Sequence, residues 1–120
     1  MANPIIPEYI TVHLGAPSDR TAQNVRVPFI DYIKNVASSE IYPTWDEDAL
    51  RANIYAIVSF ALNRIYTEYY RARGYDFDIT NNTAFDQAFV KGRNIYGNIE
   101  RIVDEIFNTY IRRKGVEEPL

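Results

Sequence analysis

Apolar residues recur at three- and four-residue spacing between residues 29 and 40, which is the pattern of an amphipathic helix. Pro28 fits the first helical position, where its missing N–H has no cost. Tyr42 precedes Pro43 and is therefore biased away from helical geometry. We expect a helix from Pro28 to about Glu40. Its apolar face holds Phe29, Ile33, Val36 and Ala37.

Residues 9–14 alternate between apolar and polar side chains, with Ile10, Val12 and Leu14 on one face. The same alternation returns at residues 25–27, after a turn-rich stretch. We expect these two segments to form a short antiparallel β pair. Residues 1–7 contain two prolines and are expected to be an extended lead-in.

A second helix is predicted from Trp45 to about Arg73. Thr44 and Glu47 have the spacing of a capping box, and Gly74 offers a C-terminal stop. The middle of this segment is apolar on nearly all sides, which is typical of an enclosed helix. We therefore expect it to be the central helix of the fold.

A last helix is predicted from Asn98 to Lys114, with Gly115 ending it. Its buried face holds Ile99, Ile102, Ile106 and either Phe107 or Tyr110. The stretch 75–83 is rich in turn-forming residues and is expected to be an ordered surface loop. These elements predict a mostly helical α+β fold, with three main helices around a long central one and a short N-terminal β pair.

The length of 120 residues predicts one domain over residues 1–120. The apolar share is 47% and the charged share 24%, as in soluble globular proteins. No run approaches the roughly 18 apolar residues of a membrane-spanning helix. The absence of cysteine excludes disulfides, and the net charge of −3 gives no electrostatic reason to bind nucleic acid.

Glu40 is the first candidate for chemistry, because it continues the apolar stripe of the first helix. Burial on that face and the negative helix end would both raise the pKa of its carboxyl group. A carboxyl group protonated near neutral pH can act as a general acid. The alternative is an acid that merely ends the helix at the surface.

Ten tyrosines and one tryptophan suggest carbohydrate binding, because aromatic faces stack on sugar rings. Alternatively, Trp45 makes a hydrophobic contact that stabilises the start of the second helix, and several tyrosines belong to the core. The polar residues of the loop lack the order of a calcium site and are interpreted as turn formers. The aromatic candidates are Tyr42, Trp45, Tyr66, Tyr69, Tyr70 and Tyr75.

The stretch VPFIDYIKNVASSEIYPTW, residues 27–45, resembles the entry of the SpoIID/LytB sporulation-type domain, with its Ala-Ala/Ser-Glu-hydrophobic-Pro motif and following Trp. Residues 49–53 and 59–62 resemble the next helix of that family, and Gln87 resembles the glutamine after its central loop. The similarity spans roughly residues 25–112. It implies a lytic transglycosylase acting on denuded peptidoglycan glycan strands, with Glu40 as acid and base.

The resemblance also sets what else to expect of the site. Tyr42, Trp45, Tyr75 and Gln87 are the candidate substrate-binding residues. The loop 76–82 lacks the cysteines and histidine that can hold zinc in the family, so neither a metal nor another cofactor is expected. The chain stops before the family's Ser-Gln-Trp-Gly segment, so part of the usual cleft wall is expected to be missing.

Two further interpretations stay open. The chain could be a non-catalytic structural or assembly subunit that forms a homo-oligomer, because tyrosine is enriched at interfaces. It could also be a peptidoglycan-binding module that kept the helical core. The resemblance implies the cell envelope or spore wall, but no signal peptide is visible in MANPIIPEYI, so the location is left open.

Overall fold

The computed structural model describes the backbone of residues 6–116 and the side chains of residues 6–108. It contains three α-helices, a single 3₁₀ turn and a three-stranded sheet among these residues. The elements are β1 (Tyr9–His13), β2 (Asn24–Pro28), α1 (Phe29–Glu40), α2 (Glu47–Tyr66), η1 (Arg71–Arg73), β3 (Ile79–Thr80) and α3 (Gly97–Val116). The α+β class expected from the sequence is confirmed.

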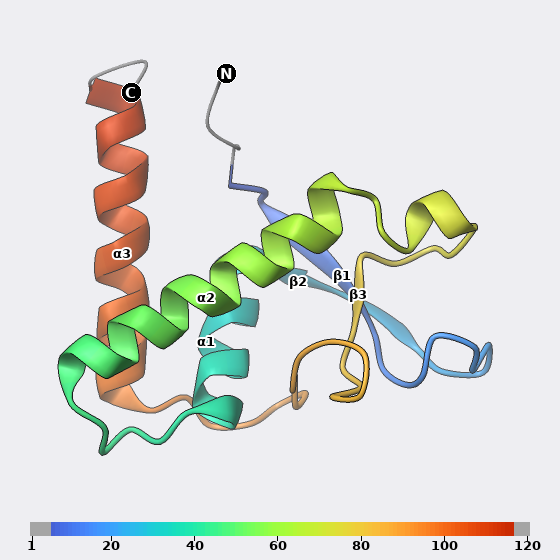
Figure 1. Ribbon diagram of the computed structural model, residues 1–120, viewed down its shortest axis with the longest axis horizontal. Coiled ribbons are helices and arrows are strands. Elements are labelled where there is room, and N and C mark those ends of the chain that lie inside the picture. The colour runs from blue at the N-terminus through green and yellow to red at the C-terminus, as the bar shows by residue number, and fades with distance from the viewer. Residues whose placement is uncertain (1–5, 117–120) are drawn as a thin grey trace.

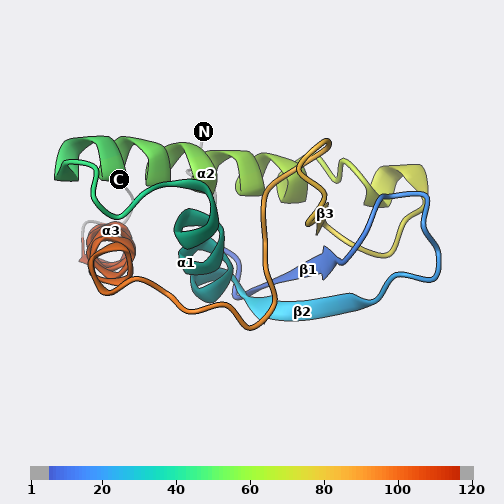
Figure 2. The same ribbon diagram turned by 90° about the horizontal axis from the view of Figure 1, so that it is seen from below.

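Helix α1 lies between α3 and the sheet, and α2 runs across these elements as an outer layer (Figures 1 and 2). The structure does not confirm the prediction that the long second helix is central. Its buried residues are limited to Leu50, Ile54, Ile57 and Ala61, while Tyr55 is 55% exposed. The apolar residues on its other sides had suggested enclosure, but several of them face solvent.

The sheet has the order β2-β1-β3. Strands β1 and β2 pair antiparallel, from Tyr9 opposite Pro28 to His13 opposite Asn24, which confirms the predicted β pair. Strand β3 pairs parallel with β1 and was not predicted. It arises within the stretch expected to be a surface loop, where Phe77 and Ile79 are in fact buried.

The boundaries of α2 differ from the prediction at both ends. Asp46, rather than Thr44, caps the helix, because its Oδ1 accepts from the N–H of Ala49 at 2.9 Å. At the other end the helix stops at Tyr66, and Glu68 has a left-handed φ of 52° that a continuing helix cannot contain. Residues 71–73 form only a 3₁₀ turn.

The boundaries of α1 agree with the prediction to within one residue. Pro28 was expected at the first helical position and instead takes the N-cap position immediately before it. Helix α3 begins near the predicted start but continues through Gly115 to Val116, so the expected stop at Gly115 is wrong. The side chain of Tyr110 lies outside the described residues. The predicted buried face of α3 is confirmed by Ile99, Ile102, Ile106 and Phe107.

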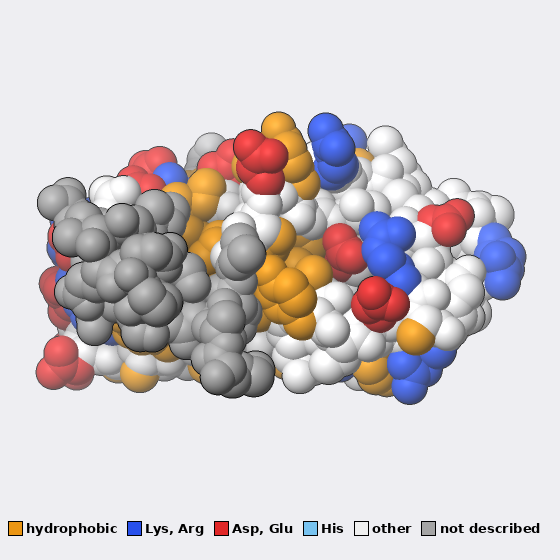
Figure 3. Space-filling view, turned by 90° about the horizontal axis from the view of Figure 1, so that it is seen from above, with side chains coloured by type: hydrophobic (Ala, Val, Ile, Leu, Met, Phe, Trp, Pro, Cys, Tyr) orange, Lys and Arg blue, Asp and Glu red, His pale blue; other side chains and the backbone are white. Residues whose placement is uncertain are grey.

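One apolar core cluster contains residues of all three helices and of strands β1 and β3. Its fully buried members include Phe29, Ile33 and Val36 of α1, together with Ile54 and Ile102 from the flanking helices. Within the described residues, no helix has the length and apolar character needed to cross a membrane. Figure 3 shows one face of the molecule, where Lys and Arg side chains alternate with Asp and Glu rather than forming one basic surface.

Candidate functional site

Glu40 is the last residue of α1, and its position differs from the one the sequence predicted. The chain becomes extended at Ile41, which takes the next buried position, while Glu40 is exposed. The expectation of a sheltered carboxyl group is therefore wrong. The side chain is nevertheless held in place, because its Oε2 accepts from the N–H of Ala88 at 2.9 Å.

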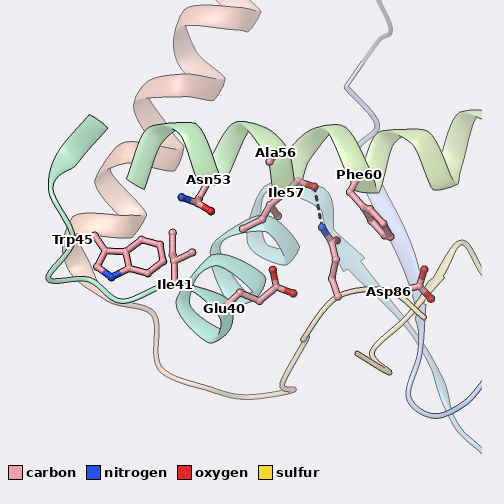
Figure 4. Close-up of a pocket in the computed structure, with 9 residues that line it drawn as sticks. Glu40, Ile41, Trp45, Asn53, Ala56, Ile57, Phe60 and Asp86 are labelled. Carbon is pink, nitrogen blue, oxygen red and sulfur yellow. Dashed lines mark hydrogen bonds between the residues drawn. The ribbon is translucent and has the colours of Figure 1, made fainter. Parts of the chain in front are cut away.

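A cleft opens beside Glu40, between the end of α1, one face of α2 and the segment around residue 87 (Figure 4). Its volume is about 310 Å³, at the lower end of the roughly 300–1,000 Å³ typical of small-molecule sites. The lining residues are Glu40, Ile41, Trp45, Asn53, Ala56, Ile57, Phe60, Asp86 and Gln87.

Glu40 stands in the middle of this cleft rather than at one end. Trp45 and Asn53 lie on one side of its carboxylate, and Phe60 and Asp86 lie on the other (Figure 4). Asn53 donates from Nδ2 to the carbonyl of Ala49 at 2.8 Å, and no described residue donates to its Oδ1. A ligand in the cleft would therefore meet an aromatic ring on each side of one carboxylate, with the Asn53 amide on the Trp45 side.

Residues 86–90, which we call the 86–90 segment, have no regular secondary structure, and the first two of them, Asp86 and Gln87, line the cleft. Side chains of α1 replace the missing backbone partners. Asn35 binds Val90 twice, donating from Nδ2 to its carbonyl at 2.8 Å and accepting at Oδ1 from its N–H at 2.9 Å. Glu40 accepts a hydrogen bond from Ala88 in the same way. Two polar side chains of α1 therefore hold this segment at two points along its length.

Gln87 ties the same segment to two helices and is buried. Its Oε1 accepts from the hydroxyl of Tyr32 at 2.9 Å, and its Nε2 donates to the carbonyl of Ile57 at 3.1 Å. Burial, with smaller effects from the nearby Asp86 and Glu40, raises the pKa of Tyr32 well above its ordinary value. Tyr32 therefore stays a neutral donor, and the Gln87 amide makes its hydrogen bonds within the protein.

Asp86 has a side chain with no exposed surface and accepts from four donors. Arg64 Nε lies 2.7 Å from Oδ1, while the Tyr70 hydroxyl and the Thr80 Oγ1 each lie 2.6 Å from Oδ2. The backbone N–H of Thr80 also donates to Oδ2 at 3.1 Å. A carboxylate has about four acceptor positions, so little capacity is left for a ligand.

The structure brings two of the four predicted binding residues into the cleft beside Glu40, namely Trp45 and Gln87. Tyr42 is not among the lining residues, but its ring makes an edge-on contact with that of Trp45 at 5.9 Å. Tyr75 lies in a separate, smaller cavity of about 130 Å³ next to His13. Its ring packs there against Tyr70 and Phe77, so it is not part of the cleft.

Asn53, Phe60 and Asp86 belong to the cleft although the sequence did not single them out. Asn53 and Phe60 share one face of α2 at helical spacing, so a polar residue beside the apolar stripe was an available signal. Asp86 had no local signal, because its partner Arg64 is 22 residues away in the chain. Among the described residues, no group of three or more His, Asp or Glu side chains could hold a metal ion.

The family model described as SpoIID, stage II sporulation protein, matches residues 18–111 of the chain. The match includes Glu40, all of α2 and the 86–90 segment. Neither a curated protein nor a solved structure gives a match.

Proposed function

The chain belongs to the SpoIID family of stage II sporulation proteins, and on this premise we propose that its cleft cleaves the denuded glycan strands of peptidoglycan, with Glu40 as general acid and base. The family itself supports a role related to sporulation and the cell wall. The finer assignment rests on Glu40, which occupies the motif position of the family's proposed acid and stands in the middle of the cleft.

The arrangement around Glu40 supports an elongated sugar ligand. Trp45, 41% exposed, offers an aromatic ring on one side of the carboxylate, and Phe60 lines the other side. Aromatic rings stack on the apolar faces of sugars, and amides such as Asn53 bind their polar groups. A strand lying along the cleft would place the bond between two sugars next to Glu40.

The proposed reaction needs one carboxyl group. Glu40 donates its proton to the glycosidic oxygen while the bond from that oxygen to C1 breaks. The resulting carboxylate then takes the proton from the 6-hydroxyl of the same sugar, whose oxygen bonds to C1 and closes an anhydro ring. This step returns Glu40 to its protonated form.

A hydrolase of the usual kind would need a second carboxylate with a free acceptor position. Among the described residues that line the cleft, Asp86 is the only other carboxylate, and its four donors occupy it. This supports a lytic reaction, in which the 6-hydroxyl of the sugar attacks C1 and closes the ring, over hydrolysis, in which a second carboxylate activates a water molecule.

The proposal is tested by Glu40→Gln, which keeps the shape and removes the transferable proton. We expect release of anhydro-sugar products from denuded glycan to fall by a factor of about 100 or more, the usual contribution of a general acid. Asp31→Asn is the matched control, because Asp31 is an exposed acid in the first turn of the same helix. Equal product release by the parent and Glu40→Gln would refute the assignment of Glu40.

A second candidate function, a structural or assembly subunit, is favoured by one observation. Tyr55 and Tyr66 on α2 are each more than half exposed, and exposed aromatic residues are common at protein interfaces. Light scattering in solution separates the two functions. A monomer that releases anhydro-sugars supports the enzyme, whereas a large assembly that is inert toward glycan supports the subunit.

A further inference from the structure

We propose that Asp86 is a positioning residue for Glu40, holding the backbone of Ala88 where its N–H fixes the direction of the Glu40 carboxylate. This inference rests on the function proposed above. Asp86 lines the cleft, but its side chain has no exposed surface and its carboxylate is taken up by four donors within the protein. It therefore acts on Glu40 from two residues away along the chain, through the 86–90 segment.

The anchor is strong because its donors come from separate parts of the fold. Arg64 belongs to α2, Tyr70 precedes η1, and Thr80 belongs to β3. Their donor-to-acceptor distances of 2.6–2.7 Å are short, as expected for hydrogen bonds to a carboxylate. Asp86 is thereby fixed relative to both the outer helix and the sheet.

The position of Asp86 is transmitted to Ala88 over a short path. Gln87, the only residue between them, is itself bound to Tyr32 and to the carbonyl of Ile57. The N–H of Ala88 then reaches Glu40 Oε2 at 2.9 Å. Because Glu40 is exposed and ends its helix, packing alone does not fix its carboxylate, and this hydrogen bond determines the direction in which it points.

An exposed carboxylate without this hydrogen bond would sample several rotamers. A misplacement of about 1 Å at a reacting group can lower the rate about 100-fold. The consequence belongs to the chemical step rather than to binding, because the Asp86 side chain has no exposed surface, while Trp45 and Asn53 lie on the opposite side of Glu40 (Figure 4). Loss of the anchor should therefore lower kcat and leave KM nearly unchanged.

The experiment follows the amide of Ala88 in the full chain by NMR while the pH is varied. In the parent, the chemical shift of this amide should change as Glu40 titrates, and Glu40→Gln should abolish the change. We expect Asp86→Asn to lose most of it, and to lower kcat on denuded glycan by about 100-fold. Tyr70→Phe removes only one of the four donors, so it gives a milder loss in a chain that folds.

Asp78→Asn is the matched control. Asp78 also accepts from an arginine, Arg71 at 2.9 Å, and from a backbone N–H, that of Thr11 at 2.8 Å, but it does not line the cleft. It should leave both the Ala88 titration and kcat unchanged. The same loss in Asp78→Asn would mean that any disturbance of this region moves Glu40, and would overturn the proposal.

If the pH-dependent shift of the Ala88 amide is unchanged in both Asp86→Asn and Tyr70→Phe, Asp86 does not position Ala88 and the proposal is refuted. If the shift is lost but kcat is unchanged, the positioning has no effect on catalysis. The amide measurement needs no enzymatic activity. An inert parent whose Ala88 titration depends on Asp86 would therefore contradict the proposed function while supporting the anchor.

Discussion

Tyr70 is 3% exposed, and its hydroxyl donates to the carboxylate of Asp86 at 2.6 Å. The pKa of Tyr70 is raised well above its ordinary value of 10.0. Burial contributes most to this rise, followed by the hydrogen bond to Asp86 and then by the negative charge of Asp86. The phenol is therefore kept protonated by the fold, and its proton is part of what stabilises the cluster around Asp86.

This gives a prediction for alkaline pH. A group whose pKa is raised on folding contributes stability that is fully present below its unfolded pKa and is lost as the pH rises toward the folded value. The free energy of unfolding should fall above about pH 10. In Tyr70→Phe the fall should be shallower, with a loss of about 1.5–3 kcal/mol at neutral pH from the missing hydrogen bond to a carboxylate.

Denaturant unfolding at a series of pH values measures both effects. Tyr55→Phe is the control, because Tyr55 is 55% exposed and the structure gives its hydroxyl no described hydrogen-bond partner. Its unfolding free energy should match that of the parent at every pH. Identical alkaline slopes for the parent and Tyr70→Phe would contradict the role assigned to the Tyr70 proton.

At the scale of elements, the start of α2 is set by one side chain. Asp46 caps the helix by accepting from Ala49, so Asp46→Ala should lower the free energy of unfolding by about 1 kcal/mol, within the range of about 0.5–2 known for such caps. Thr44→Ala should leave it unchanged, because Thr44 precedes the cap. Urea unfolding of both variants measures the difference, and a larger loss for Thr44→Ala would reverse the assignment.

Local patterns predicted the elements that depend on local interactions. Helix α1 and the β1–β2 pair follow from apolar spacing and turns, and both agree with the structure. Strand β3 could not be predicted, because its pairing with β1 joins residues far apart in the chain and involves only Ile79 and Thr80. Short strands of this kind carry almost no periodic signal.

The candidate site divides in the same way. Glu40 and Trp45 were found from a continuous motif, and both line the cleft. The expected burial of Glu40 failed because spacing along an ideal helix does not show that the chain turns extended at Ile41. The cluster around Asp86 depends on tertiary contacts alone, so no pattern in the sequence could reveal it.

At the scale of the whole molecule, an ionic cluster joins the outer helix to α3. Arg51 binds Glu47 at 2.8 Å and also Glu105, and Arg101 binds the same two acids at 3.1 and 3.0 Å. Hydrogen bonds from Arg51, followed by those from Arg101, lower the pKa of both Glu47 and Glu105. The cluster is exposed, so solvent screens its contribution.

The sign of this shift predicts weakening in acid. Carboxyl groups whose pKa is lowered on folding contribute stability above their unfolded pKa, and this is lost as the pH falls through the folded value. The free energy of unfolding should begin to decline below about pH 4.5, the ordinary pKa of the two glutamates. The double variant Glu47→Gln/Glu105→Gln should decline less steeply than the parent over that range.

Thermal unfolding from about pH 6 to pH 3 would measure the two slopes. Glu8→Gln serves as the control, because Glu8 is an exposed acid outside the cluster. Added salt should reduce the difference between the parent and the double variant, since exposed ion pairs are screened. If the stability of the parent and that of the double variant fall equally steeply with pH, the cluster does not contribute to the stability of the fold in the way proposed.

The pairing of β3 with β1 also bears on the order in which the molecule is assembled. Thr11 and Asp78, which hydrogen-bond beside this pairing, are 67 residues apart in the chain, and contacts between such distant residues form slowly because a long loop must close first. The hairpin and α1 can form early from neighbouring residues. Thr80 of β3 donates twice to Asp86, which lines the cleft. This part of the cleft wall therefore cannot be complete before β3 has paired with β1.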